Sequence, residues 1–402
     1  MLLRLISLGL LTISSHLSWC QFSNPVRVGT PTAFQVYSLC SVDLDNDGDK
    51  DVVSGLYSRP RITFAERLSD GSYKDRDDVC KTVNYLSSVK AGDLDNDGDI
   101  DLISTSIIEG KVHWHENIGN GEFAGAVTLG ANMDGANSVI MADLDNDGDN
   151  DVIACSKNDN TIAWFENYGT GNFSVKQIVT NSFTAPKAVL TTDIDSDGLL
   201  DIVGFGNIAY WYKNLGGGIF ATGQPLGTFV VSGNVEMADL DNDGDMDFIA
   251  AASVVKWLEN IGGGNFASSQ TLTAVPQQPT SVSIADMDND GDKDLVVAST
   301  FDNKIAWFEN DGFTVFNTEH VVSLNAPGIN KRVVADDVDN DGDIDILTSL
   351  YDTHEIRVYL NDGFGNFGSF DAVAPYSGTG GSGYGSGGSG AVVSADFNND
   401  GI

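Results

Sequence analysis

The chain has 402 residues, and its 58 acidic side chains against 21 basic ones give a formal net charge of −37. Apolar residues make up 41% of the chain, which is enough for a large core and excludes a disordered acidic tail. The acidic balance excludes nucleic acid and anionic membrane surfaces as main partners, because both require basic patches. Cations are the partners that this composition predicts.

Residues 1–20 are typical of a secretory signal peptide. Arg4 precedes an apolar run from Leu5 to Ile13, and small or polar residues then lead to Cys20. This run is too short to cross a bilayer, which needs about 20 apolar residues, and no later run is long enough. We therefore expect a secreted protein, extracellular or at the cell surface, with lipid attachment at Cys20 as the alternative.

Three cysteines, Cys40, Cys80 and Cys155, follow the predicted cleavage site. Their odd number leaves at least one thiol free or paired outside the chain. A disulfide between Cys40 and Cys80 is a hypothesis, based on their place in one repeat and on an oxidising compartment.

Residues 21–376 are built from a repeat that is recognised by its aspartates. Seven segments carry aspartates at alternate positions followed by a glycine, and most have the sequence D-L-D-N-D-G-D-x-D. Of the 58 acidic residues, 36 lie in these segments and in an incomplete eighth copy, so the remaining 22 nearly balance the 21 basic ones. The segments begin 46 to 51 residues apart, at Asp43, Asp93, Asp143, Asp193, Asp239, Asp286 and Asp337.

Each repeat predicts four short strands. An apolar run such as Val52–Val53 follows every aspartate loop, and a second strand of the type T-I-A-W-F-E-N leads into a glycine turn, N-x-G-x-G-x-F. Repeats of this length with no amphipathic helix predict an all-β fold, a β-propeller with four-stranded blades.

Seven complete units favour a seven-bladed ring. The segment Gln21–Gly29 has no loop of its own and resembles the last strand of a blade, so we expect it to close the ring beside the seventh unit. Residues 377–390 are rich in glycine and serine and predict a linker or exposed loop. Residues 391–402 begin a truncated eighth repeat, which indicates a fragment of a longer protein and keeps an eight-bladed ring as the alternative.

One position in the second strand after each loop is occupied by a large apolar residue, which is aromatic in six of the seven units. It is Trp114, Trp164, Trp211, Trp257 or Trp307 in the inner units, with Phe64 and Val358 in the outer ones. We expect these side chains to pack between neighbouring blades, because a core role explains their recurrence. A stacking platform for sugars is the alternative.

The aspartate loops predict Ca²⁺ sites. Carboxylates at positions 1, 3, 5 and 9 of the loop and the backbone carbonyl at position 7 form a set of hard oxygen ligands, and the glycine at position 6 permits the bend. Mg²⁺ requires stricter geometry, and Zn²⁺ prefers nitrogen or sulfur ligands. An EF-hand is excluded, because position 12 lies in a predicted strand and is never a glutamate.

The fourth loop has Ser196 and Leu199 where the others have asparagine and aspartate, and we expect it to bind calcium nevertheless, because position 7 contributes only its carbonyl. The predicted ligand residues of the seven loops are Asp43, Asp45, Asp47, Asp49 and Asp51; Asp93, Asp95, Asp97, Asp99 and Asp101; Asp143, Asp145, Asp147, Asp149 and Asp151; Asp193, Asp195, Asp197, Leu199 and Asp201; Asp239, Asp241, Asp243, Asp245 and Asp247; Asp286, Asp288, Asp290, Asp292 and Asp294; and Asp337, Asp339, Asp341, Asp343 and Asp345.

These units resemble the FG-GAP/VCBS repeat family, whose calcium-loop blades also build the head of integrin α chains. The resemblance covers about residues 33 to 375 and rests on the aspartate loops and the W-x-E-N-x-G-x-G-x-F words. It implies a propeller with about seven structural Ca²⁺ ions, each held between the first two strands of a blade. Phe-Gly and Gly-Ala-Pro words are not regularly present and Arg-Gly-Asp is absent, so an integrin-type role is not specifically supported.

We expect a secreted binding or adhesion module whose ligand is an unidentified protein or glycan. The alternative is a carbohydrate-active enzyme or lectin, because similar calcium propellers occur in polysaccharide lyases and sugar dehydratases. An enzyme would need unrepeated polar side chains in one pocket, and the candidates are few: His113, His115, His320 and His354. No Ser-His-Asp or Cys-His arrangement, phosphate loop or nucleotide fingerprint is present, so we expect no enzymatic activity.

Overall fold

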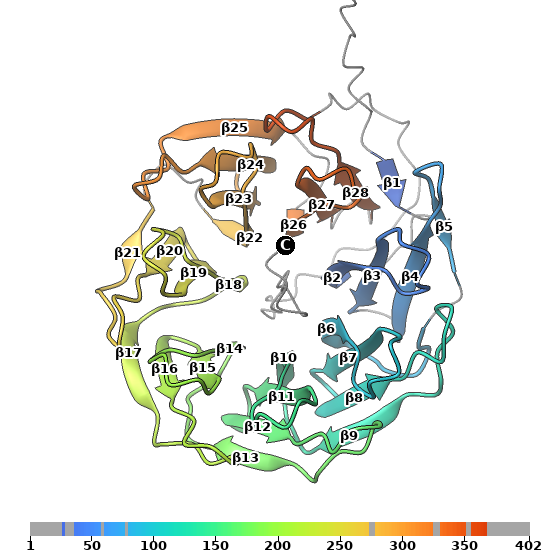
Figure 1. Cartoon of the computed structure of the whole chain (residues 1–402), viewed down its shortest axis with the longest axis vertical. Coiled ribbons are helices and arrows are strands. Elements are labelled where there is room, and N and C mark those ends of the chain that lie inside the picture. Colours follow the sequence, from blue (N-terminus) through green and yellow to red (C-terminus); the bar gives the residue numbers. More distant parts are fainter. Residues whose placement is uncertain are drawn as a thin grey trace, which may run out of the picture.

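Seven four-stranded antiparallel sheets form a ring, so the chain is an all-β, seven-bladed propeller (Figure 1). The computed structural model describes residues 26–28, 36–57, 60–76, 79–272, 278–324, 330–350 and 355–367. The predicted signal peptide, the Gly/Ser-rich segment 377–390 and the eighth repeat start at 391–402 lie outside these residues. Within them no helix has the length and apolar character that crossing a membrane requires.

In each blade the strands follow one another from the centre of the ring outward (Figure 1). The first three blades consist of β2 (Val36–Val42), β3 (Asp51–Leu56), β4 (Arg61–Arg67) and β5 (Tyr73–Asp75); β6 (Leu86–Gly92), β7 (Asp101–Ser106), β8 (Lys111–His115) and β9 (Val127–Ala131); and β10 (Ala136–Ala142), β11 (Asp151–Ser156), β12 (Thr161–Phe165) and β13 (Gln177–Thr180).

The next three blades repeat this order. They consist of β14 (Ala188–Thr192), β15 (Asp201–Phe205), β16 (Ile208–Tyr212) and β17 (Gln224–Thr228); β18 (Val235–Ala238), β19 (Asp247–Ala251), β20 (Val255–Leu258) and β21 (Gln270–Thr271); and β22 (Pro279–Ala285), β23 (Asp294–Ser299), β24 (Lys304–Glu309) and β25 (Thr318–Ser323).

The seventh blade joins the two ends of the ring. It contains β26 (Asn330–Asp336), β27 (Asp345–Leu350) and β28 (Glu355–Tyr359), and its outermost strand is β1 (Val26–Val28) from the start of the described chain. Strand β1 pairs antiparallel with β28, with Val26 opposite Val358. The expected ring closure by the segment Gln21–Gly29 is thus confirmed for Val26–Val28.

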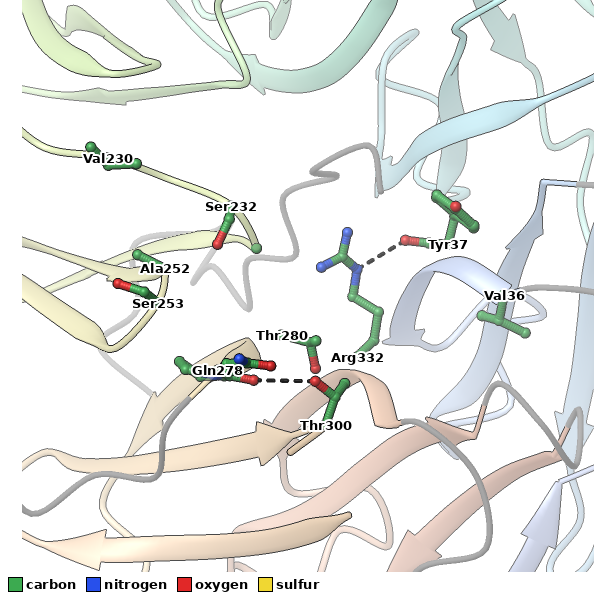
Figure 2. A pocket seen from close by; sticks show the side chains of 12 residues that line it. Val36, Tyr37, Val230, Ser232, Ala252, Ser253, Gln278, Thr280, Thr300 and Arg332 are labelled. Atoms are coloured by element: carbon green, nitrogen blue, oxygen red, sulfur yellow. Dashed lines mark hydrogen bonds between the residues drawn. The ribbon is translucent and has the colours of Figure 1, made fainter. Parts of the chain in front are cut away.

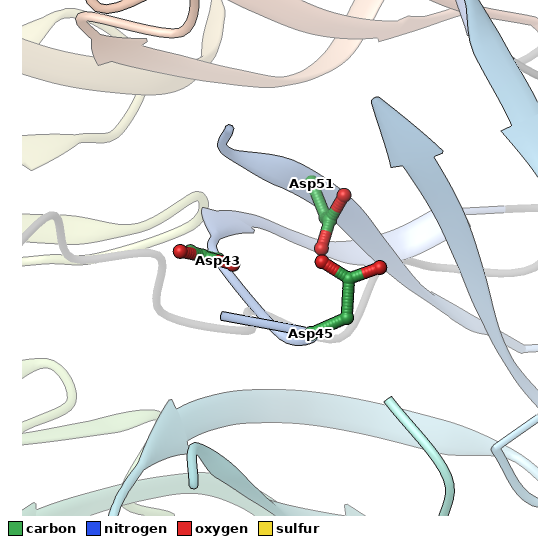
Figure 3. A group of neighbouring side chains, drawn as sticks. All are labelled: Asp43, Asp45 and Asp51. Carbon is green, nitrogen blue, oxygen red and sulfur yellow. The ribbon is translucent and has the colours of Figure 1, made fainter. Parts of the chain in front are cut away.

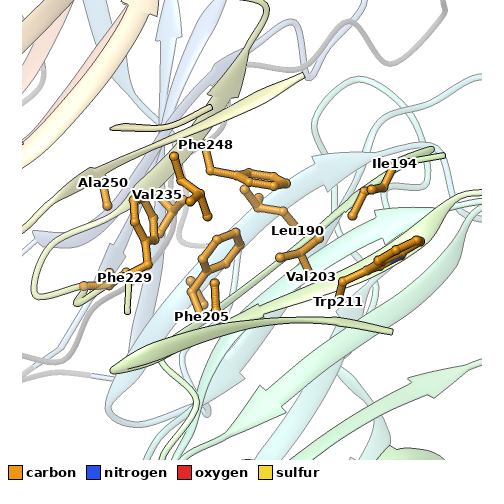
Figure 4. Packing of buried hydrophobic residues seen from close by; sticks show 13 residues of the cluster. Leu190, Ile194, Val203, Phe205, Trp211, Phe229, Val235, Phe248 and Ala250 are labelled. Atoms are coloured by element: carbon orange, nitrogen blue, oxygen red, sulfur yellow. The ribbon is translucent and has the colours of Figure 1, made fainter. Parts of the chain in front are cut away.

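The core is divided among the blade interfaces. Seven apolar clusters are present among the described residues, and each combines side chains of two adjacent blades. Between the fourth and fifth blades, Phe205 packs edge-on against Phe248 with ring centroids 5.1 Å apart, and Phe229 lies beside them (Figure 4). Burial of apolar area between sheets is the main favourable term that holds such a ring together.

The recurring tryptophans lie in these interfaces, as expected. All five are at most 6% exposed. A glycine of the following blade's hairpin turn closely approaches four of these rings, and a Cβ added at Gly171 would lie 2.2 Å from Cη2 of Trp114. The same contact joins Gly218 to Trp164 and Gly365 to Trp307. The glycine turn and the tryptophan are therefore two halves of one contact between blades, and the rings are not exposed for stacking on sugars.

The hypothesis of a Cys40–Cys80 disulfide is wrong, because both residues are free thiols, as is Cys155. Cys40 lies on the inner strand β2, whereas Cys80 pairs with Ile62 on the far side of β4. Three strand spacings of about 4.8 Å separate them, and a disulfide needs Cα atoms within about 7 Å.

Candidate metal centres

Every aspartate loop joins the inner strand of a blade to the second strand, as predicted. In the first blade the loop leaves β2 after Val42, and Asp51 at position 9 is already the first residue of β3. The other six loops have the same placement, because Asp101, Asp151, Asp201, Asp247, Asp294 and Asp345 also begin their strands. All seven loops therefore lie at the same end of the ring.

Backbone conformation explains two of the recurring residues. Position 4 has a φ angle between 57° and 62° in every loop, a left-handed conformation that asparagine tolerates better than most residues. The glycine at position 6 has φ between 89° and 101°, which other residues rarely adopt. This bend directs the amide of Gly48 to Asp43 Oδ2, at 2.9 Å, and brings Asp43, Asp45 and Asp51 together (Figure 3).

The aspartate at position 9 anchors each loop to the blade. Asp51 is fully buried; its Oδ2 accepts a hydrogen bond from the amide of Leu44 at 3.0 Å, and its Oδ1 accepts one from the amide of Arg67 at 2.8 Å. Burial raises the pKa of Asp51 to about 7. Burial likewise raises the pKa of the other six aspartates at this position. An unneutralised carboxylate is therefore costly at this position.

The aspartate at position 3 carries the strongest indication of a missing partner. Its Oδ1 atom is buried and accepts no hydrogen bond in any of the seven loops, from Asp45 to Asp339. Burial, followed by the charge of the aspartate two residues later, raises the pKa of Asp45, Asp95 and Asp145. Buried polar atoms are normally satisfied, so these oxygens fit a cation that the structure does not contain.

The acidic side chains converge as a cation site requires. In the first three loops, carboxylate oxygens of positions 1, 3 and 9 lie within 4.8 Å of one another, and in the fourth and fifth loops those of positions 1, 3 and 5 do. Two further groups of this kind are present. The donors are all oxygens, the ligand type that Ca²⁺ takes and Zn²⁺ does not favour. The residues present therefore fit a hard divalent cation.

The aspartate at position 7 does more than offer the backbone carbonyl expected from the sequence. Its side chain accepts a hydrogen bond from the asparagine at position 4 of the preceding loop: Asn46 Nδ2 of the first loop donates to Asp99 Oδ1 of the second at 2.7 Å. Asn340 Nδ2 of the seventh loop donates to the carbonyl of Gly48 in the first at 2.6 Å, which joins the last loop to the first. These loop-to-loop bonds are Asn46–Asp99, Asn96–Asp149, Asn146–Gly198, Asn242–Asp292, Asn289–Asp343 and Asn340–Gly48.

A second asparagine, from the W-x-E-N words, reinforces this end of the ring. Asn167 is fully buried, and its Nδ2 donates to the carbonyl of Leu94 in the preceding loop at 2.7 Å and to that of Asn150 in its own loop at 2.9 Å. Asn117, Asn214, Asn310 and Asn361 make the equivalent pairs of bonds. From the sequence these asparagines are expected only as turn residues, because the carbonyl that each one reaches belongs to another repeat.

The fourth loop differs from the others in a feature beyond Ser196 and Leu199, a lysine that contacts its carboxylates. Lys213 occupies the place that glutamate has in the W-x-E-N words, and its ammonium contacts Asp195 Oδ2 and lies 2.9 Å from Asp197 Oδ2. The bonds to these two carboxylates raise the pKa of Lys213. In addition, Ser196 stands where the other loops have the bridging asparagine, and within the described residues it makes no bond to the fifth loop. The fourth loop therefore already contains a cation of its own.

The histidines considered for an enzyme are not gathered in one place. His113 and His115 are buried in β8, where His115 Nε2 lies 2.8 Å from Ser104 Oγ. His320 is stacked on Trp307 in the sixth blade and lies 3.1 Å from a carboxylate oxygen of Glu309. His354 lies outside the described residues.

Fold and loops together define a β-propeller with an aspartate-rich loop in each blade. A family model for the FG-GAP-like repeat matches residues 43–104, 93–154, 143–204, 248–297, 286–348 and 337–402. These matches span more than half of the chain, and the protein belongs to the FG-GAP-like repeat family. No curated protein gives a significant match to this sequence.

Solved structures show the same architecture at low sequence identity. An Agrocybe aegerita lectin that recognises non-reducing terminal N-acetylglucosamine is 18% identical, with a TM-score of 0.55 over 72% of this chain and 81% of the lectin. BBS1N, solved in complex with ARL6DN, is 12% identical, with a TM-score of 0.57 over 84% of this chain and 95% of that one. Virginiamycin B lyase from Staphylococcus aureus is 13% identical, with a TM-score of 0.55 over 83% and 97%. These likenesses concern the fold alone.

Proposed function

We propose that this protein is a secreted calcium-binding interaction module, in which Ca²⁺ stabilises the ring and does no chemistry. The observation that carries the proposal is the buried, unpartnered Oδ1 of the aspartate at position 3 in the six loops where no lysine contacts that carboxylate. Bound Ca²⁺ supplies positive charge to carboxylates that otherwise repel one another. The ligands would be the carboxylates at positions 1, 3, 5 and 9 and the carbonyl at position 7, as in the loop from Asp43 to Asp51.

We further propose six calcium ions per chain rather than seven. In the fourth loop the ammonium of Lys213 contacts two of the carboxylates that would bind the ion, so it supplies the neutralising charge itself. The other six loops have no lysine in this place; Arg76 comes no closer to Asp45 than 3.9 Å and bonds to Glu66 instead. At a Kd near 10⁻⁴ M and about 1 mM calcium, each ion would add about 1.4 kcal/mol, or about 8 kcal/mol for six.

An interaction role agrees with the family and with the fold, which presents loops on a rigid ring. One fold relative is a lectin, so an unidentified glycan or protein is a reasonable ligand class. A catalytic role has less support, because His113 and His115 are buried in their blade and cannot reach a substrate. The signal-like residues 1–20 support secretion to the extracellular space or the cell surface.

Calcium counting tests the site assignment. Equilibrium dialysis of the metal-free protein should give six ions per chain, and chelator should lower the melting temperature. Asp145→Asn, which changes a position 3 ligand, should remove one ion, whereas Asp149→Asn at position 7 should leave the number unchanged. Lys213→Glu introduces the glutamate that five of the other six blades have at this position and should raise the count to seven.

These measurements test the structural role of calcium and the role of Lys213 separately. A melting temperature that does not change on chelation, together with no bound calcium, refutes the structural role of the ion. Seven ions in the unmodified protein refute only the role of Lys213. For the interaction role, binding to a glycan panel or a surface-protein library in calcium, lost on chelation, is expected, and hydrolysis or elimination of a polysaccharide would contradict the non-enzymatic proposal.

A further inference from the structure

A cavity lies at the end of the ring opposite to the aspartate loops. It has a volume of about 450 Å³ and is lined by residues of the fifth, sixth, seventh and first blades (Figure 2). Its lining comes from the beginnings of inner strands, such as Tyr37 of β2 and Arg332 of β26, and from the ends of second strands, such as Thr300 after β23. The loops lie at the other ends of these same strands. The cavity is therefore separate from the candidate calcium sites.

Arg332 places a positive charge in this cavity. The residue is only 5% exposed, and its Nε donates to the backbone carbonyl of Tyr37 at 2.9 Å, which fixes the guanidinium between the first and seventh blades (Figure 2). Burial lowers the pKa of Arg332 to about 10, so it stays charged at neutral pH. Two further buried charges interact electrostatically with it, the carboxylate of Glu236 and the ammonium of Lys90, and the Nη atoms of Arg332 face the cavity.

The charge of Arg332 is buried in a cavity whose lining contains no acidic residue, although the chain as a whole is strongly acidic. A buried charge is costly unless it is paired and hydrogen-bonded. None of the twelve residues that line the cavity is an aspartate or a glutamate, although the chain has a net charge of −37. The cavity thus has a single formal charge, which is positive. Behind the lining, Lys90 and Glu236 complete a buried group of two cations with Arg332 and one carboxylate, so one positive charge is left over, and this surplus points to an anionic ligand.

The rest of the lining indicates what the anion carries. Ser232, Ser253, Thr280 and Thr300 contribute hydroxyl groups, and Gln278 contributes an amide. The hydroxyl of Thr300 donates to the carbonyl of Gln278 at 3.4 Å, so its oxygen remains able to accept from a ligand. Hydroxyl and amide groups around a cavity bind a polyol, and 450 Å³ is within the range of small-molecule sites, about 300–1,000 Å³.

We propose that this cavity binds a small carboxylate that carries hydroxyl groups, of the hexuronic acid class. The two Nη atoms of Arg332 match the two oxygens of a carboxylate, which a lysine ammonium does not. The serine and threonine hydroxyls would receive and donate hydrogen bonds with the sugar ring. This ligand site goes beyond the proposed calcium-dependent role, because no aspartate loop contributes to it.

Calorimetric titration of the full chain in calcium tests the proposal with three matched probes. D-Glucuronate should bind, and D-glucose, which has a hydroxymethyl group in place of the carboxylate, should bind at least about tenfold more weakly, a difference of about 1.4 kcal/mol. Glucose 6-phosphate separates a carboxylate site from a phosphate site and should bind more weakly than glucuronate. Equal binding of glucuronate and glucose, tighter binding of the phosphate, or no binding of glucuronate overturns the proposal.

Variants connect the binding to the cavity. Arg332→Met should abolish the preference for glucuronate over glucose, and Arg332→Lys should restore it only in part. Arg357→Met is the matched control, since Arg357 lies in β28 of the same blade and is similarly buried, but pairs with Glu355 and does not line the cavity. If Arg332→Met fails to fold by circular dichroism, Thr300→Val replaces it and should weaken glucuronate binding several-fold. Unchanged binding in the folded cavity variants contradicts the assignment.

Discussion

The contact between a glycine turn and a tryptophan of the preceding blade allows a stringent test of how the ring is held together. Gly217 and Gly218 are neighbours in the turn of the fourth blade, and both have positive φ angles, +60° and +70°. A Cβ added at Gly218 would lie 2.3 Å from Cζ2 of Trp164, whereas one added at Gly217 would meet no atom within 4 Å. Alanine at either position is strained, but only at Gly218 does it also push two blades apart.

The expected magnitudes follow from these two effects. Left-handed backbone costs alanine about 1–2 kcal/mol, so Gly217→Ala should lower the free energy of unfolding by that amount. Overpacking of an interior contact adds about 1–3 kcal/mol, so Gly218→Ala should lose about 2–5 kcal/mol. Urea unfolding in calcium, followed by tryptophan fluorescence, measures both. Equal losses in the two variants would refute the conclusion that this contact holds blades together.

Two further predictions concern buried polar groups. Asn167→Ala removes the donor to the carbonyls of Leu94 and Asn150, and the loss of these buried hydrogen bonds should lower the free energy of unfolding by about 2–3 kcal/mol in the same urea assay. The control, Asn172→Ala, changes an exposed asparagine and should cost less than about 1 kcal/mol. A similar small loss in both variants would contradict the bridging role. Burial, followed by the charge of His113, lowers the pKa of His115 to about 3, so the stability that its neutral form contributes is complete above pH 6.5 and is lost as the pH falls toward 3. At pH 5 this loss is about 2 kcal/mol, and His115→Phe, which copies the buried Phe165 of the next blade, should remove it from the pH dependence of unfolding; parallel pH curves would show that His115 does not titrate in this way.

Much of the architecture could be predicted because it is encoded locally. The strand after each loop, the hairpin turns and the number of blades all follow from patterns within about fifty residues, and even the ring closure by Val26–Val28 had a signal, a strand with no loop of its own. The convergence of Asp43, Asp45 and Asp51 is likewise a property of nine consecutive residues.

What could not be predicted depends on which blades become neighbours. The bond from Asn340 to Gly48 joins residues 292 positions apart, and nothing in either loop indicates its partner. The cavity around Arg332 is assembled from four blades, so no single repeat reveals it. The wrong disulfide has the same origin, because Cys40 and Cys80 share a repeat but lie on opposite sides of the blade. Lys213 did have a signal, lysine in place of the glutamate in W-x-E-N, which acquires meaning only beside Asp195 and Asp197.

The seventh blade has a consequence for biosynthesis. Strand β1 is made early, but its partner β28 lies more than 300 residues later in the chain. At about 5–20 residues per second, translation leaves β1 without its partner for on the order of 20 to 60 s. An unpaired strand edge is a place where chains associate wrongly, so the nascent protein passes through a vulnerable interval that ends when β28 emerges and the circle is completed.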